Sequence, residues 1–183
     1  AIPLDIVLAL GMMKLAAFGE MKEGVAKQFL IFRNKHTWSM TLLYIVTFGS
    51  FIGFSNALPL SINVIFGQSH VLGPDGVLKH VPNPNAPSAL TYAWMGPFIG
   101  AAVRPIGGWI SDKVGGSIVT QVISAVMVVA SAWVGYVMMQ AYGSATPEQY
   151  FPMFLGLFML LFFATGIGNG STFRTIGVIF DRT

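Results

Sequence analysis

Residues 92–116 read YAWMGPFIGAAVRPIGGWISDKVGG and place one arginine, Arg104, inside an otherwise apolar run. Between Ala89 and Ile110, Arg104 is the only charged residue. These 22 residues, at a rise of about 1.5 Å per residue, would form a helix roughly 33 Å long, which is enough to cross a bilayer. The run therefore predicts a transmembrane helix.

Small residues recur every four positions around this arginine, in the series Gly96, Gly100, Arg104 and Gly108. Such a stripe lets a neighbouring helix come close, so Arg104 is expected to face protein and not lipid. An arginine near the bilayer centre costs about 2.5 to 3.5 kcal/mol on insertion scales, and it needs a compensating group. An anionic substrate would supply one, and the alternative is a set of carbonyls or a carboxylate on another helix.

The composition indicates an all-α, polytopic membrane protein. Hydrophobic residues make up 54% of the chain and charged residues 9%, against about 25% charged residues in soluble domains. The net charge of +3 lies in loops, so nucleic-acid binding is not expected. The chain has no cysteine, and the histidines His36, His70 and His80 are dispersed among loop-like residues. We therefore expect solvated histidines, no metal site and no cofactor.

The remaining chain divides into two predicted parts. Residues 1–36 are expected to form the end of a membrane helix and a basic cytoplasmic loop, and the absence of an initiator methionine suggests a start within a longer protein. Residues 37–183 are expected to contain four transmembrane helices at about 38–66, 88–110, 118–142 and 147–180. The Pro- and Gly-rich residues 67–87 predict an irregular extramembrane loop, and the run from Gly166 to Thr172 predicts close packing or a bent helix.

Basic residues would lie almost entirely on one side of these four crossings. One side receives six, namely Lys22, Lys27, Arg33, Lys35, Lys113 and Arg182, whereas the other receives only Lys79. This asymmetry predicts that the first side is cytoplasmic.

Depth along the predicted helices brings a candidate site together. A rise of about 1.5 Å per residue puts Tyr44 roughly 9 Å, Arg104 roughly 12 Å and Phe48 roughly 15 Å from the cytoplasmic boundary. Thr172 and Asn169 fall at overlapping depths. Tyr44 and Phe48 belong to a stripe that an ordinary packing role explains equally well. Arg174 lies nearer the boundary, where snorkelling is the expected role.

Two sets of motifs resemble a known family. Residues 108–116, GWISDKVGG, resemble the short cytoplasmic loop motif of major facilitator transporters, although its usual terminal basic residues are missing. The runs 48–55 (FGSFIGFS), 96–100 with Arg104, and 168–173 (GNGSTF) resemble NarK-type nitrate/nitrite porters. The resemblance implies a partial major facilitator fold, from the end of helix six through helix ten of a twelve-helix protein, in the cell inner (plasma) membrane.

The resemblance also implies site residues. The substrate-binding residues would be Arg104, Tyr44 and Phe48, and the gating loop motif would comprise Gly108, Asp112, Lys113 and Gly115. Gly100, Asn169, Ser171 and Thr172 are candidates for the pocket or for helix packing. A guanidinium suits this role because its planar fork of donors matches a planar oxyanion at two points.

The function that the resemblance implies is transport of nitrate and nitrite by alternating access, as part of nitrate assimilation. The predicted spans 38–66, 88–110 and 118–142 contain no Asp or Glu. These spans therefore hold no carboxylate that could take up a proton for coupled transport, and nitrate/nitrite antiport is favoured. Nitrate/proton symport, transport of another small anion and a non-transporting membrane subunit are the alternatives. The expected partners are the two anions, the lipid bilayer and the remaining helices. No catalytic constellation indicates an enzyme.

Overall fold

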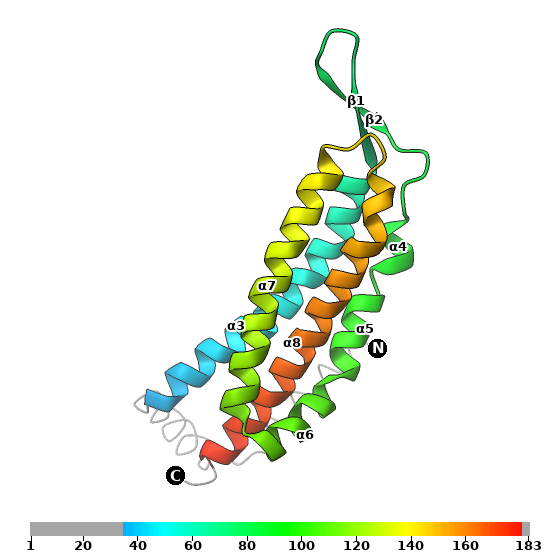
Figure 1. Cartoon of the computed structure of the whole chain (residues 1–183). Helices are drawn as coiled ribbons and strands as arrows, with labels where there is room; N and C mark the ends of the chain where they lie inside the picture. The colour runs from blue at the N-terminus through cyan, green and yellow to red at the C-terminus, as the bar shows by residue number, and fades with distance from the viewer. Residues whose placement is uncertain (1–34, 181–183) are drawn as a thin grey trace, which may run out of the picture. The chain divides into compact units, whose positions relative to one another are not determined.

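The computed structural model describes residues 35–180. The chain forms two compact units, Ala1–Leu42 and Leu43–Thr183, and the helical bundle belongs to the second. The predicted helix end and basic loop at 1–36 lie outside the described residues except for Lys35 and His36, the first two residues of a long helix. Figure 1 shows the elements in chain order. They are α3 (Lys35–Ser61), η2 (Ile62–Phe66), β1 (Gln68–Leu72), β2 (Leu78–Pro82), α4 (Ala89–Tyr92), α5 (Met95–Ala102), α6 (Arg104–Val114), α7 (Gly116–Tyr142), η3 (Pro147–Tyr150) and α8 (Phe151–Phe180).

Within residues 35–180, three helical segments are long and apolar enough to cross a membrane. They comprise Thr37–Phe66, Gly116–Tyr142 and Pro147–Ile176, close to three of the four predicted spans. The first segment continues through Pro59 and ends in the π-helical turn η2. The protein is thus an all-α, polytopic transmembrane helical bundle.

The prediction of one continuous helix at 88–110 is wrong, because α4, α5 and α6 divide this segment. Pro97 and Pro105 explain the divisions, since each lacks an N–H and its ring crowds the carbonyl four residues earlier, at Ala93 and Ala101. The junction residues Trp94 and Val103 keep right-handed helical backbone angles, with φ of −76° and −84°. The segment is therefore a kinked series of helical turns, and α6 continues to Val114, beyond the predicted end.

The predicted irregular loop at 67–87 contains a β-hairpin instead. Strands β1 and β2 pair antiparallel with His70 opposite His80, and Gly76 in the turn has a φ of +72°, which glycine adopts readily. Asn83 ties the hairpin to the bundle, because its Nδ2 donates to the Phe66 carbonyl at 3.1 Å and to Oε2 of Glu148 at 3.0 Å. The proline and glycine content hid a hairpin whose strands are only five residues each.

Helix α8 is the central helix of the bundle. It packs against α5, α6 and α7, and 56% of its most apolar window is buried, against 22% for α7. Aromatic side chains join it to α3: Phe54 lies edge-on to Phe158 at 6.2 Å and contacts Phe162 at 6.5 Å, measured between ring centroids. The middle of α8 is therefore fixed relative to α3 and α6.

Close packing of α8 against α5 and α6 rests on glycines from both sides. A Cβ at Gly100 would meet the Phe51 ring at 2.6 Å, and one at Gly166 would meet the backbone of Gly100. The run 166–172 is thus closely packed within an unbroken helix. Beyond the kink at Val103, the tight contact is made by Gly107, which faces the backbone of Ile167. A Cβ at Gly108 would lie 3.8 Å from the Gly170 carbonyl oxygen, which is an ordinary contact. The predicted four-residue stripe therefore shifts by one position at the kink.

Candidate functional site

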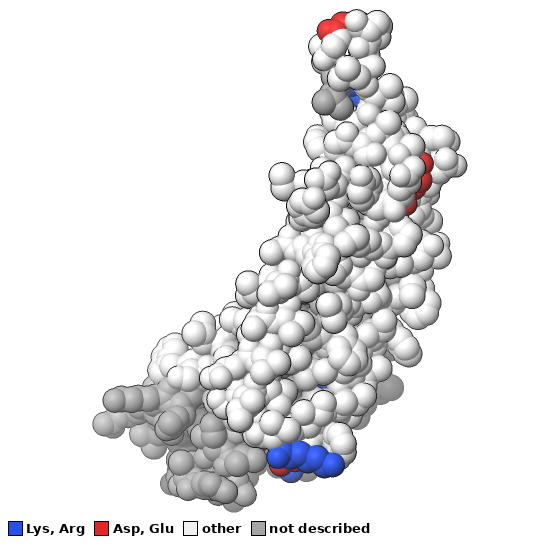
Figure 2. All heavy atoms as spheres, in the orientation of Figure 1, with Lys and Arg blue, Asp and Glu red and all other residues white. Residues whose placement is uncertain are grey.

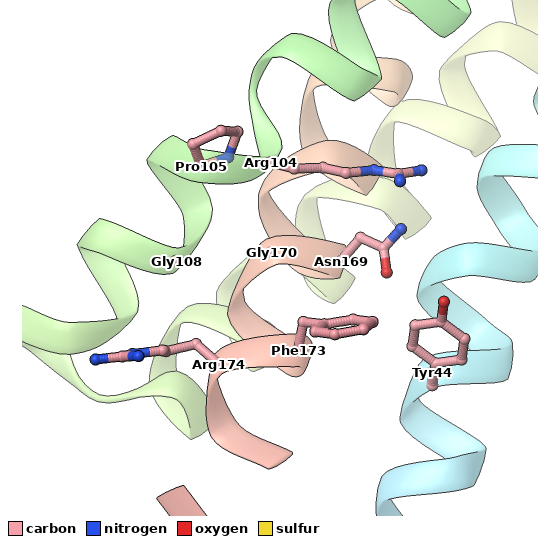
Figure 3. A pocket seen from close by; sticks show the side chains of 8 residues that line it. All are labelled: Tyr44, Arg104, Pro105, Gly108, Asn169, Gly170, Phe173 and Arg174. Atoms are coloured by element: carbon pink, nitrogen blue, oxygen red, sulfur yellow. The ribbon is translucent and has the colours of Figure 1, made fainter. Parts of the chain in front are cut away.

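A pocket of about 440 Å³ opens where α3, α6 and α8 meet (Figure 3). Its lining includes Tyr44 from α3, Arg104 and Gly108 from α6, and Asn169, Phe173 and Arg174 from α8. The sequence predicted that Tyr44, Arg104 and Asn169 share a depth, and the structure brings these three side chains to one pocket.

Arg104 is the first residue of α6, directly after the kink at Val103. A Cβ at Gly170 would overlap the Arg104 carbonyl oxygen, so the glycine allows α6 and α8 to approach at this point. The kink and the glycine together fix the position of the Arg104 backbone, from which the side chain extends. The side chain extends from α6 toward α3, above Asn169 and Tyr44 in Figure 3.

The guanidinium has aromatic neighbours and no counterion among the described residues. Its central carbon lies 4.8 Å from the centroid of the Phe51 ring and 5.5 Å from that of Phe48. Such cation–π contacts contribute about 0.5 to 2 kcal/mol. The Nε atom is buried and forms no hydrogen bond. The alternative expectation of a carboxylate or carbonyl partner is therefore not met within residues 35–180.

The predicted aromatic residues divide between lining the pocket and supporting it. Tyr44 lines the pocket, and its ring stacks on Phe48 at 5.3 Å and meets the edge of Phe173 at 5.9 Å. Phe48 does not line the pocket but contacts Arg104 from the side. Phe51, which was not predicted as a site residue, makes the shorter cation–π contact. Its position three residues after Phe48, on the same face of α3, was the available signal.

Asn169 is a second buried polar group in the pocket. The residue is 3% exposed, and its Oδ1 has no hydrogen-bond partner. Figure 3 shows its amide nitrogen pointing toward Arg104 and its amide oxygen pointing toward the Tyr44 side. Buried amide groups nearly always find partners, so this arrangement indicates a place for a ligand or water.

Three other candidates lie outside the pocket lining. Ser171 is fully buried, shares a hydrogen bond with Thr120 at 3.2 Å and donates to the Gly116 carbonyl at 3.1 Å. Thr172 donates to the Gly168 carbonyl at 2.8 Å, within its own helix. Gly100 contacts Phe51 and α8. None of the three lines the pocket.

The loop motif forms a charged cluster at the end of the bundle where α6 meets α7, visible as blue and red atoms low in Figure 2. Arg174 Nε donates to Oδ1 of Asp112 at 2.6 Å. Arg174 is exposed at the end of the bundle, where snorkelling was expected, and the structure adds a carboxylate on α6 that pairs with it. Lys113 lies over the Trp109 ring at 3.9 Å, and Gly115 has a φ of +96°, which favours glycine.

The histidine prediction also needs a correction. His70 is 3% exposed, with its ring 4.5 Å from that of His80 and 4.4 Å from that of Tyr142, and neither ring nitrogen has a hydrogen-bond partner. His80 is exposed, as expected. The hairpin, which the sequence prediction missed, is what buries His70.

The fold and the site together define a multi-pass membrane segment that holds an arginine in a pocket between its helices. No family model matches the chain. The chain is 44% identical over 154 residues to the "Probable nitrate/nitrite antiporter NarK2" of Thermus thermophilus, covering 84% of this chain and 30% of that protein. It is 35% identical over 164 residues to the "Nitrate/nitrite transporter NarU" of Salmonella typhimurium, covering 90% of this chain and 30% of that protein.

The NarU transporter of Escherichia coli is similar at 34% identity over 161 residues, with 88% of this chain and 30% of that protein covered. The chain belongs to the NarK-type nitrate/nitrite porters of the major facilitator superfamily. It lies in the inner membrane as a multi-pass protein, and it spans about 30% of the length of these relatives.

Proposed function

We propose that the chain forms part of a transporter of nitrate and nitrite, and not of an enzyme, and that Arg104 binds the anion. The observation that carries the proposal is the buried Nε of Arg104, which has no hydrogen-bond partner beside a pocket. A cation in that position without a counterion is costly, and a small anion would compensate it. The relatives are nitrate/nitrite transporters by name, which points to nitrate and nitrite as the anions.

The chemistry of the site suits a flat oxyanion. A guanidinium stays protonated at every physiological pH and offers two parallel N–H donors to two oxygens. Phe48 and Phe51 lie against the guanidinium, and Tyr44 lies across the pocket. These rings exclude water from the guanidinium and so strengthen its attraction for an anion by lowering the local dielectric.

The charges near the pocket support alternating access with obligatory exchange. The loop motif contains one carboxylate, Asp112, and it is paired with Arg174. Among the described residues, no carboxylate pairs with Arg104. An empty arginine site would oppose reorientation of the carrier, and a bound anion would favour it. We therefore favour nitrate/nitrite antiport over proton symport, which requires a protonatable group elsewhere in the whole protein.

Transport of another small anion and a non-transporting role are the remaining alternatives, and protection from labelling separates them. Because this chain has no cysteine, Gly108→Cys places one thiol in the pocket in a full-length protein otherwise free of cysteine. Gly143→Cys is the matched control, because a Cβ at either glycine has its nearest neighbour at 3.8 Å and Gly143 lies outside the pocket.

Nitrate and nitrite should slow the reaction of a small charged thiol reagent with Gly108→Cys and leave Gly143→Cys unaffected. Addition of Arg104→Lys should remove the protection. Equal labelling at position 108 with and without either anion would reject the proposed site. Protection by a different anion alone would favour that anion as the substrate.

A further inference from the structure

We propose that Asn169 is a second anion contact and that it discriminates nitrate from nitrite, an inference that rests on the proposed function of Arg104. Asn169 lies on α8, the most buried of the three candidate membrane spans within residues 35–180, and is 3% exposed. Its unpartnered Oδ1 points toward the Tyr44 side, whereas its amide nitrogen, the donor that an anion needs, points toward Arg104 (Figure 3). Asn83, also buried, behaves differently, because its amide bonds Phe66 and Glu148 and so anchors the hairpin. Asn169 has no such structural bond to explain an amide at its position.

The orientation of the Asn169 amide favours an acceptor between it and Arg104. Its nitrogen points toward the guanidinium, so that two groups which can only donate face the same space (Figure 3). The orientation in the structure is the one that leaves both sets of donors free for an anion.

The backbone around Asn169 is held on two sides. A Cβ at Gly168 would lie 3.3 Å from Thr47 on α3, and one at Gly170 would overlap the Arg104 carbonyl oxygen. The glycines that flank Asn169 therefore set its distance from both α3 and α6. The amide does not have to move a helix to reach an anion at Arg104, so the contact is preorganised.

The number of oxygens in each anion gives the discrimination. The fork of Arg104 can engage two oxygens of a planar anion at once. Nitrite has only two oxygens, and both then lie at the fork, so that any bond from the amide would be shared with the guanidinium on one oxygen. Nitrate has a third oxygen, which remains for the amide of Asn169. Loss of the amide should therefore weaken nitrate binding selectively, whereas a purely structural role would affect the two anions equally.

The test compares half-saturating concentrations for nitrate and nitrite in exchange by the full-length protein. Asn169→Leu keeps the approximate volume without a donor, and Asn169→Ala avoids overpacking. We expect the half-saturating concentration of nitrate to rise about tenfold, the factor associated with one hydrogen bond to a charged group. The half-saturating concentration of nitrite should stay within about twofold of its original value. The control is Thr165→Val, which removes a buried hydroxyl one turn away that bonds only the Phe162 carbonyl.

An equal change for both anions, or no change for either, would overturn the role of Asn169. Failure of both Asn169 variants to fold would assign the residue to packing and would overturn it as well. The proposed function fails separately: in that case the unmodified protein would exchange neither anion, or Arg104→Lys would exchange both normally.

Discussion

The backbone of Gly170 on α8 faces the carbonyl oxygen of Arg104 on α6 so closely that no Cβ fits between them. Because Asn169 directly precedes Gly170, the same contact sets the separation of the Asn169 amide and the guanidinium. The pocket therefore depends on a backbone approach as much as on the side chains that line it.

Gly170→Ala should abolish nitrate transport and lower the unfolding temperature of the full-length protein. The added methyl group would overlap a backbone oxygen, which cannot rotate away, so α6 and α8 must separate. Gly135→Ala on α7 is the matched control, because a Cβ there meets nothing within 4 Å. Normal uptake by Gly170→Ala, measured with equal amounts of protein in the membrane, would show that the close approach is not needed.

Arg104→Lys should reduce nitrate transport severely while insertion into the membrane persists. Lysine keeps the positive charge but loses the planar fork that holds two oxygens. Uptake of labelled nitrate, corrected for the amount of inserted protein, measures the effect. Normal uptake by this variant would remove Arg104 from the binding site.

Phe48→Ala should weaken nitrate binding about threefold to thirtyfold, the range of one cation–π contact. The ring lies 5.5 Å from the guanidinium carbon and also stacks on Tyr44, so its loss removes support from both. Phe54→Ala is the control, because its ring packs on Phe158 and Phe162 away from the guanidinium. A loss of expression with unchanged affinity in Phe48→Ala would instead indicate that this ring serves packing alone.

Docking of the hairpin on α7 should weaken in acid. Burial lowers the pKa of His70, and the neighbouring His80 lowers it further. The other groups around it are Tyr142 on α7, the Lys79–Asp75 pair near the turn and Glu148, which bonds Asn83. An undocked His70 takes up a proton near pH 6.5. Docking is therefore fully stabilised above that pH and loses stability as the pH falls toward the lowered pKa.

Hydrogen exchange in residues 68–72 and 78–82 measures this docking between about pH 8 and pH 5, after correction for intrinsic exchange rates. Protection should fall on acidification in the unmodified protein. His70→Phe keeps a ring against Tyr142 without a titrating group, so its protection should not change with pH. The same decline in both proteins would exclude His70 as the cause.

Hydrophobic length and composition were sufficient to predict most of the fold. The spans at 38–66, 118–142 and 147–180 follow from runs of apolar residues, which need no knowledge of tertiary contacts. The breaks in the arginine segment were readable in principle, because Pro97 and Pro105 remove specific helical hydrogen bonds. The segment was nevertheless predicted as one helix because it is apolar throughout. The strands of the hairpin are too short for an alternation of apolar and polar residues to be recognised among the prolines.

The residues that share one depth in the membrane could be predicted from the sequence. The side-chain pairs that form between distant segments could not. Equal rise per residue brings Tyr44, Arg104 and Asn169 to one level. The Asp112–Arg174 ion pair joins residues 62 positions apart, and only the rotation of α6 against α8 brings them together. Burial of His70 likewise depends on how the hairpin folds back on Tyr142, which single-sequence periodicity does not contain.

The most direct test of anion exchange at Arg104 uses the full-length protein in liposomes. Nitrate uptake is compared between nitrite-loaded and anion-free vesicles, with and without an inward proton gradient, and with Arg104→Lys alongside. We predict rapid uptake into nitrite-loaded vesicles, little into anion-free vesicles, no stimulation by the proton gradient and loss of exchange in Arg104→Lys. Equal uptake into anion-free vesicles that accelerates with inward proton flow would contradict exchange at an unpaired arginine.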